Sequence, residues 1–486
     1  MSFTISRRDF MGAAAGVSML GMGMGMVGAA YADGTSGTLD NVEANLGADC
    51  PWCGPGSVSG DWNGTPEEVR AVGGCTMPLD ELNRRRHMYV DAQTEYTCED
   101  GTVIPAVYVK VRALINTYGS GVGCTVTDHS FDWIMQEMTE EQAQAFIDMP
   151  YGKRFTPIEF AVTSGREIEE CEQICDHFFS GGWIGRVVND SGTFYYHVPA
   201  VQGFVEYHTP EIYTGKTGIP EAVAINGSDL SLVRANVGTG SLLPAPCSRD
   251  VVKDGDIYPY DDLETIWSAK NKFSLSPCFC RFTAGVRAGT LDLPGYPDGD
   301  FDLSDIVSAE CGDDVMTCMS SGEEAQFWID HHVGREITKE EALERLRKSR
   351  EDGFILEHTY SKECDTICSC KIHCCTVLKG WLKYGSTDVE MTRNWLRYTL
   401  EFTPDTCAKC GACAERCPME TITMDEETGY PVVGNYCLAC GQCAYVCPTQ
   451  SRWLVRKDDV RPPFAEDIHE ADNLMAADRF ERGLIW

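Results

Sequence analysis

Eight cysteines near the C-terminal end of the chain have a spacing suited to metal chemistry. They form two runs with the same pattern, C-x2-C-x2-C-x3-C-P, which contain Cys407, Cys410, Cys413 and Cys417, and then Cys437, Cys440, Cys443 and Cys447. A glycine within each run lets the backbone approach bound atoms closely, and a proline ends each loop. Zinc sites use two separated pairs of cysteines rather than triplets, so a zinc ribbon or a disulfide knot fits this pattern poorly.

The two runs resemble the cluster-binding loops of the bacterial two-cluster ferredoxins. The resemblance implies two [4Fe-4S] clusters, each held by three thiolates of one run and the last thiolate of the other. The implied ligand sets are Cys407, Cys410, Cys413 with Cys447, and Cys437, Cys440, Cys443 with Cys417. The pattern predicts a ferredoxin domain over residues 396–456, with a hairpin of residues 421–424 and 431–433 between the two loops.

A second group of nine cysteines lies between residues 278 and 375. Its C-x-C and C-C elements do not suit one ferredoxin loop, but they suit a site assembled from two distant segments. We predict one or two additional iron–sulfur clusters here, with a cage of disulfides or one structural zinc as the alternatives. The candidate ligands are Cys278, Cys280, Cys368, Cys370, Cys374 and Cys375, with His373 as a further candidate.

The N-terminal residues 1–32 resemble a twin-arginine export signal. Ser6-Arg7-Arg8-Asp9-Phe10-Met11 is followed by an apolar stretch diluted with glycine, and then by a small-x-small cleavage site before Asp33. The resemblance implies export of a folded protein to the periplasm or the outer face of the cytoplasmic membrane, after its clusters have been inserted. An uncleaved N-terminal anchor is the alternative. Many thiolates in an exported protein indicate an anaerobe.

The charge of the chain excludes some classes of partner. Forty basic and 74 acidic residues give a formal net charge of −34. Nucleic acid and anionic lipid surfaces both need positive patches, so neither is expected to bind. A negative surface suits a basic redox partner, either a membrane-bound electron donor or a reductase subunit.

The sequence predicts an α+β, multidomain protein with four pieces before an acidic tail. After the signal these are an irregular Cys-containing region (33–137), a winged-helix-like module with an extension (138–245), the Cys-rich region (246–395), the ferredoxin domain (396–456) and the tail (457–486). In the Cys-rich region, Thr338 and Glu341 predict the start of a helix that ends at Gly353. Ala342, Leu343 and Leu346 are expected to face inward from it.

The winged-helix-like module is predicted from a helix, a second helix and a hairpin. Thr156 and Glu159 form a capping box, and the helix over 167–180 is followed by strands over 183–188 and 193–198. The second helix has an apolar face made of Ile168, Cys171, Ile174, Cys175, Phe178 and Phe179. DNA binding is the usual role of such a module, but this helix is acidic, so we expect packing or docking instead.

Cys50 and Cys53 form a C-x-x-C pair that resembles a thioredoxin-type redox pair. The surrounding pattern of a thioredoxin fold is not evident. Disulfides, free structural thiols, and a metal site that also includes Cys75 and Cys98 are the alternatives.

These features resemble the Cys-rich two-cluster ferredoxin proteins of anaerobes and predict an exported iron–sulfur electron-transfer protein, the relay of an extracytoplasmic oxidoreductase. The layout of an export signal, a middle region and a C-terminal two-cluster domain is also similar to that of the corrinoid reductive dehalogenases, which would make the chain a terminal reductase. A cluster-stabilised binding module is a third reading. The sequence assigns no catalytic residue.

Overall fold

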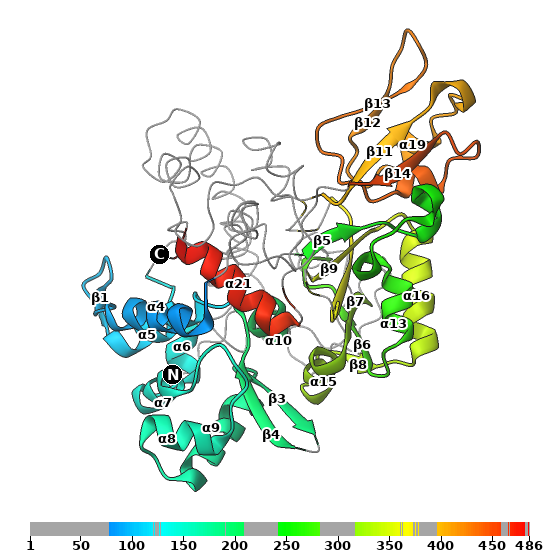
Figure 1. Cartoon of the computed structure of the whole chain (residues 1–486). Helices are drawn as coiled ribbons and strands as arrows, with labels where there is room; N and C mark the ends of the chain where they lie inside the picture. Colours follow the sequence, from blue (N-terminus) through cyan, green and yellow to red (C-terminus); the bar gives the residue numbers. More distant parts are fainter. Residues whose placement is uncertain are drawn as a thin grey trace, which may run out of the picture.

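The computed structural model combines helices and sheets in one chain, as the α+β prediction requires (Figure 1). It describes residues 77–119, 121, 126, 128–189, 191–208, 242–281, 316–359, 361, 363–372, 375, 378, 396–457, 465, 467–481 and 485. The predicted export signal, Cys50, Cys53, Cys75, His373 and Cys374 lie outside these residues. Within them, no helix is long and apolar enough to cross a membrane.

The first described part is helical. It contains α4 (Leu79–Asp91), a small hairpin of β1 (Tyr96–Thr97) and β2 (Val103–Ile104), α5 (Ala106–Ile115), α6 (Asp132–Glu137) and α7 (Glu140–Asp148). The sequence had indicated irregular structure for 33–137, which is wrong for the described part. The reason lies in α4, whose buried face consists of Leu82, Arg86 and Val90, so a charged residue interrupts its apolar periodicity.

The predicted helix, helix and hairpin follow. They are α8 (Pro157–Ser164), α9 (Ile168–Ser180), β3 (Ile184–Asn189) and β4 (Gly192–His197). Thr156 and Glu159 make both hydrogen bonds of the capping box, and Cys171 and Cys175 are buried in the core of this part. Ile168 is exposed, contrary to the prediction, because it lies in the first turn of α9. A relation to winged-helix proteins stays a prediction.

An antiparallel sheet of six strands forms the middle of the molecule. Its strands, in spatial order, are β5 (Leu242–Ala245), β9 (Ile355–Thr359), β10 (Thr366–Cys370), β7 (Met316–Ser321), β6 (Phe273–Pro277) and β8 (Arg335–Glu336). β5 falls at the end of the predicted piece 138–245, yet it pairs with β9. The sheet therefore joins segments that are far apart in the sequence.

The two faces of this sheet differ in character. One face carries apolar residues such as Leu275, Met319 and Ile367, and it packs against α13 (Leu263–Ser268) and α16 (Lys339–Glu351) (Figure 1). α16 begins at Thr338 as predicted, and it buries Ala342 and Leu346. On the other face lies α15 (Gly322–Asp330), which also packs into the core of the helical part.

The C-terminal ferredoxin-type domain has its own small sheets. It contains β11 (Tyr398–Phe402), α19 (Ala412–Arg416), β12 (Ile422–Met424), β13 (Pro431–Val433), α20 (Gln442–Tyr445) and β14 (Arg452–Arg456). β11 pairs with β14, and β12 with β13 forms the predicted hairpin. The chain then returns to the helical part, where α21 (Ile468–Glu481) lies beside α4 (Figure 1). Ala476 and Ala477 pack there against Met77 and Leu82.

Candidate metal centres

The two C-terminal cysteine loops have the same backbone geometry. Gly411 and Gly441 both have positive φ, 78° and 81°, at equivalent positions before α19 and α20. Lys409 and Ala439 also occupy the left-handed region at equivalent positions, with φ of 54° and 51°. The loops therefore repeat a strained conformation that a side chain adopts only when the surroundings require it.

The thiols of these loops lie near one another. Cys413 interacts with Cys407, while Cys443 interacts with both Cys437 and Cys417. Cys413 and Cys443 are both buried, and together with Ile422 they form one small apolar cluster. The contact of Cys443 with Cys417 is what the implied crossing of the fourth ligand requires. The full ligand sets stay a prediction.

Hydrogen bonds to sulfur lower the pKa of the Cys447 thiol. Burial raises the pKa of this thiol, but hydrogen bonds from the Ser451 side chain, the Ser451 backbone and Thr449 outweigh that effect and lower it to about 7. The Ser451 backbone N–H lies 3.3 Å from the Cys447 Sγ. Hydrogen bonds to sulfur favour the thiolate, which is the form that ligates metal.

The two loops have different surroundings. Cys410 in the first loop is exposed, and a Cβ placed on Gly411 would meet nothing within 4 Å. The second loop is packed against the middle of the molecule: the Cys247 N–H donates to the Cys440 carbonyl oxygen at 2.9 Å, and a Cβ on Gly441 would come within 2.5 Å of the Val251 Cγ2. One loop therefore faces outward and the other faces inward.

Cysteines from two neighbouring strands, β7 and β10, lie on the polar face of the six-stranded sheet. Cys318 on β7 pairs with Ser276 on β6, and Cys368 on β10 pairs with Glu357 on β9. The pairing of Ile367 with Met319 continues by one residue to place Cys368 opposite Cys318. Directly opposite residues of antiparallel strands point to the same face. The side chains of these residues therefore form a row across one face of the sheet.

Six thiols on this face form a continuous cluster, which we call the sheet thiol cluster. The neighbouring pairs are Cys278 with Cys280, Cys280 with Cys375, Cys375 with Cys370, Cys370 with Cys368, and Cys368 with Cys318. Cys278 also interacts with Cys368, so the two ends of the cluster approach each other. Hydrogen bonds between these thiols, together with burial, raise the pKa of Cys278 and Cys318 well above the usual value.

The donor set of the sheet thiol cluster fits a metal centre. The Sγ atoms of Cys370 and Cys375 and a carboxylate oxygen of Glu357 all lie within 4.8 Å of one another, and all three residues are buried. Among the described residues, these three form the one group of three donors this close together. Thiolates select soft or borderline metals such as iron–sulfur clusters and zinc. Binding such a metal would release the protons that these thiols hold.

Five of the six candidate ligands in the Cys-rich region are thus brought together, from two distant segments as expected. The sixth, Cys374, lies outside the described residues. Sequence reasoning missed Cys318, Glu357 and Cys247 as neighbours of these sites. Cys318 and Glu357 lie on strands β7 and β9, and a strand's sequence does not indicate which distant strand it pairs with. No local signal marked them.

The sheet thiol cluster and the inward-facing ferredoxin loop meet in one apolar cluster. Buried Cys370, Cys375 and Leu438 belong to it, and Cys368, Cys417 and Cys440 pack against it. Polar contacts fix the two parts beside it: Arg416 donates to the carbonyl oxygens of Arg350 and Glu351 at 2.6 Å, and Gln442 donates to that of Phe354 at 2.7 Å.

A buried ion pair joins the same two parts on the other side of the sheet. Arg397, just before β11, makes two hydrogen bonds to the Asp261 carboxylate at 2.7 and 2.6 Å. His358 on β9 lies 3.0 Å from the same carboxylate, and all three side chains are essentially inaccessible. Burial alone would raise the pKa of Asp261, but Arg397 and His358 hold it below the usual value. The ferredoxin-type domain is therefore firmly attached to the sheet.

Comparison with known proteins identifies one segment. Residues 406–451 match the family described as a 4Fe-4S dicluster domain, and the match spans all eight cysteines of the two loops. No curated protein and no solved structure matches the chain. The C-terminal segment is thus an iron–sulfur domain of the ferredoxin type, which supports an electron-transfer role and binding of 4Fe-4S clusters.

Proposed function

We propose that this chain is an exported electron relay, in which the two ferredoxin clusters exchange electrons with a further iron–sulfur centre on the sheet thiol cluster. Iron–sulfur clusters supply one-electron transfer at potentials that the protein tunes through charge, burial and hydrogen bonds to sulfur. The chain's own contribution is to hold the thiols in place and to set their distances and surroundings.

The observation that carries this proposal is the apolar cluster shared by Cys368, Cys370, Cys375, Cys417 and Cys440. In this cluster the candidate ligands of the sheet centre pack beside Cys417 and Cys440, which are candidate ligands of one ferredoxin cluster. A short route through packed side chains suits electron transfer between the two sites. A domain that only stabilised a fold would not need this adjacency.

The outward-facing loop is the proposed contact for a redox partner. Four exposed acidic residues lie close to this loop in the sequence, namely Glu401, Asp405, Glu415 and Glu420. A partner with a basic patch would be attracted to this surface, and the attraction would weaken as salt is added. A membrane-bound donor and a reductase subunit both suit this role.

The test of the relay is the iron content of protein purified without oxygen. Two ferredoxin clusters account for about eight irons per chain, at four per cubane, so the proposal expects a clear excess over eight. Cys370→Ser should remove that excess and leave the ferredoxin clusters, while Cys437→Ser should lower the ferredoxin iron. Cys175→Ser, which changes a buried core thiol of the helical part, is the control. Equal iron in the wild type and in Cys370→Ser would end the proposal of a sheet centre.

Export is tested separately. Changing Arg7 and Arg8 together to Lys should leave a precursor loaded with iron in the cytoplasm, because the twin-arginine pathway carries folded proteins. Normal export of the double variant would contradict this part of the proposal. The corrinoid alternative stays a prediction, and the absorption spectrum of the anaerobic protein would reveal a corrinoid directly.

A further inference from the structure

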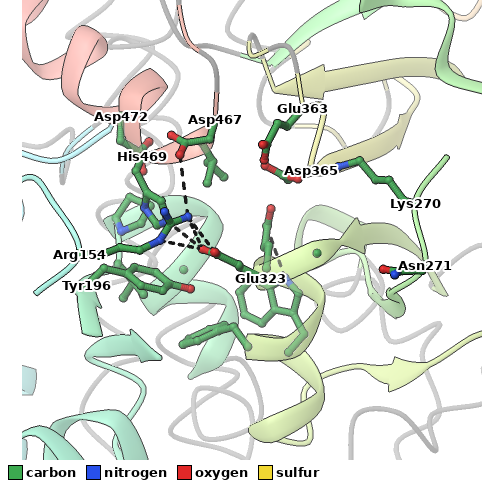
Figure 2. Close-up of a pocket in the computed structure, with 18 residues that line it drawn as sticks. Arg154, Tyr196, Lys270, Asn271, Glu323, Glu363, Asp365, Asp467, His469 and Asp472 are labelled. Carbon is green, nitrogen blue, oxygen red and sulfur yellow. Dashed lines mark hydrogen bonds and ion pairs between the residues drawn. The ribbon is translucent and has the colours of Figure 1, made fainter. Parts of the chain in front are cut away.

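A cavity of about 520 Å³ lies where three parts of the molecule meet (Figure 2). The helical part contributes Arg154 and Tyr196, and the sheet region contributes Lys270, Glu323 and Asp365 (Figure 2). Asp467, just before α21, and His469 and Asp472 on α21 complete the lining (Figure 2). Cavities of about 300–1,000 Å³ at the meeting of such parts commonly bind small molecules. The ferredoxin-type domain does not line this cavity, so the proposed electron relay assigns no role to it.

The charges that line the cavity are unbalanced. Its carboxylates are Glu323, Glu324, Glu363, Asp365, Asp467 and Asp472, while its basic residues are Arg154, Lys270 and His469. The basic residues are already engaged. Arg154 and His469 both contact Glu323, at 2.7 and 3.3 Å. Lys270 contacts Asp365 at 2.7 Å.

Three of these carboxylates form no ion pair with a described residue, namely Glu324, Glu363 and Asp472. Glu363 lies at the exposed rim, and Asp472 makes no hydrogen bond or ion pair to a described residue. Burial raises the pKa of Asp472 to about 7, although His469 and Arg86 act in the opposite direction. Asp472 is half-buried at the cavity, and a carboxylate with no direct ion pair is expected to attract a cation.

The remaining walls of the cavity suit an organic cation rather than a metal ion. Tyr196, Phe327 and Trp328 supply aromatic rings, which attract an ammonium or guanidinium group placed over their faces. A metal ion would need several donor atoms close together. Among the described residues, the close group of three is Glu357, Cys370 and Cys375 on the sheet, and none of these lines the cavity.

One residue links this cavity to the sheet thiol cluster. Glu324 lines the cavity, is only 8% exposed, and accepts hydrogen bonds from Trp328 and from the Thr366 hydroxyl. Thr366 is two residues before Cys368 on β10 and therefore points to the same face of the sheet. Cys318 and Glu324 also interact electrostatically. A molecule in the cavity would thus lie next to the sheet thiols, with one carboxyl group between them.

We propose that the cavity binds a small organic cation, an amine, guanidine or quaternary ammonium compound, beside the sheet thiol cluster. Binding depends on the cavity alone. Its influence on a redox centre rests in addition on the function proposed above.

The test uses two probes of the same shape and different charge. Choline and its neutral isostere 3,3-dimethyl-1-butanol are titrated into the full anaerobic protein by calorimetry, and agmatine serves as a second cation. Saturable binding of at least one cation, about tenfold or more tighter than the neutral isostere, is expected. Absence of saturable binding by both cations, or equal binding of choline and its isostere, would overturn the proposal.

Variants locate the binding. Asp467→Asn with Asp472→Asn removes two carboxylates from the cavity and should weaken cation binding by about tenfold or more, which corresponds to about 1.4 kcal/mol. Asn retains the capping hydrogen bond that Asp467 accepts from the Glu470 N–H. Glu470→Gln changes an exposed acid on the same helix that does not line the cavity, and it should bind like the wild type. Unchanged binding in the double variant would place the cation elsewhere and contradict the proposal.

The last measurement separates this proposal from the relay. Cys370→Ser, which is expected to lose the sheet centre, should still bind the cation. In the wild type, a bound cation should change the paramagnetic signal of the sheet centre and leave those of the ferredoxin clusters unchanged. Cation binding by a protein that carries no iron on the sheet would refute the relay and support the cation site. Iron on the sheet without cation binding would refute the cation site and support the relay.

Discussion

At the scale of single residues, the Asp472 carboxyl is a group whose protonation lies near balance at neutral pH. Its pKa in the folded chain is about 7, against 3.8 for a free side chain, and burial is the main cause. The folded state therefore holds a proton that the unfolded state releases. The contribution of this carboxyl to the free energy of unfolding is fully present below about pH 4 and is lost as the pH rises to about 7.

The raised pKa of Asp472 predicts the effect of Asp472→Asn. Between pH 4 and 7 the wild type should lose up to about 1.4 kcal/mol per pH unit through this residue, and the variant should lose none through it. His469, Arg86 and Asp467 act on the same carboxyl, and they remain in the variant. Urea midpoints measured from pH 5 to 8 should therefore fall less steeply in the variant. Glu470→Gln should retain the wild-type slope; the same flattening in that control would contradict the assignment.

The buried ion pair of Asp261 and Arg397 gives a second prediction at this scale. Arg397→Met leaves the Asp261 carboxylate inside the protein without its cation, which should cost about 3–5 kcal/mol. The matched control is Arg456→Met, because Arg456 and Asp256 form a partly exposed ion pair at 2.8 Å that should contribute only about 0–1 kcal/mol. Adding Asp261→Asn to Arg397→Met should recover part of the loss. Equal unfolding midpoints for Arg397→Met and Arg456→Met would show that burial of the Asp261–Arg397 pair does not affect stability.

At the scale of elements, the two cysteine loops provide a matched pair of glycines. Gly411→Ala and Gly441→Ala both place a side chain at positive φ, which should cost about 1 kcal/mol each. In Gly441→Ala the new Cβ also meets Val251 at 2.5 Å, so the second loop must move away from the residues beside it. We expect Gly441→Ala to lower the unfolding midpoint more than Gly411→Ala does. We also expect it to change the spectrum of the iron–sulfur cluster bound by the inward-facing loop. The opposite order of the two variants would contradict this packing.

The elements also show which parts of the structure a sequence can predict. The starts of α8 and α16 follow from Thr156 and Thr338, because a side-chain N-cap is a local hydrogen-bond pattern. The two cysteine loops follow from the spacing of their cysteines, which is also a local pattern in the sequence. The six-stranded sheet was not predicted, since β5 pairs with β9 more than a hundred residues later. The sheet thiol cluster was predicted only in part, because Cys318 becomes a neighbour of Cys368 through strand register alone.

At the scale of the whole molecule, α21 holds distant parts of the chain together. The Arg479 guanidinium is buried and donates to the Asn116 carbonyl oxygen, the Asn116 side chain and the Gly119 carbonyl oxygen, at 2.9, 3.0 and 3.2 Å. Asn473 on the same helix bonds to Arg86 and to the Gly152 carbonyl oxygen. The helical part near α4 and one wall of the cavity therefore depend on α21 for their structure.

Arg479→Met tests this dependence. It leaves buried carbonyl oxygens without donors, at about 1–3 kcal/mol each, so the residues around α4 and α5 should become sensitive to protease and cation binding should weaken. The iron of the ferredoxin-type domain should not change, because α21 does not belong to the apolar clusters that hold its cysteines. Loss of iron in Arg479→Met would mean that the two ends of the molecule are more strongly coupled than these contacts indicate.

The packing of α21 against α4 also has a consequence in time. Nearly four hundred residues separate α4 from α21, so a ribosome makes α21 long after α4. The surface formed by Met77 and Leu82 therefore stays uncovered until α21 has been made, although domains usually fold as they emerge. The helical part thus reaches its final packing only after the sheet and the ferredoxin-type domain have been synthesised.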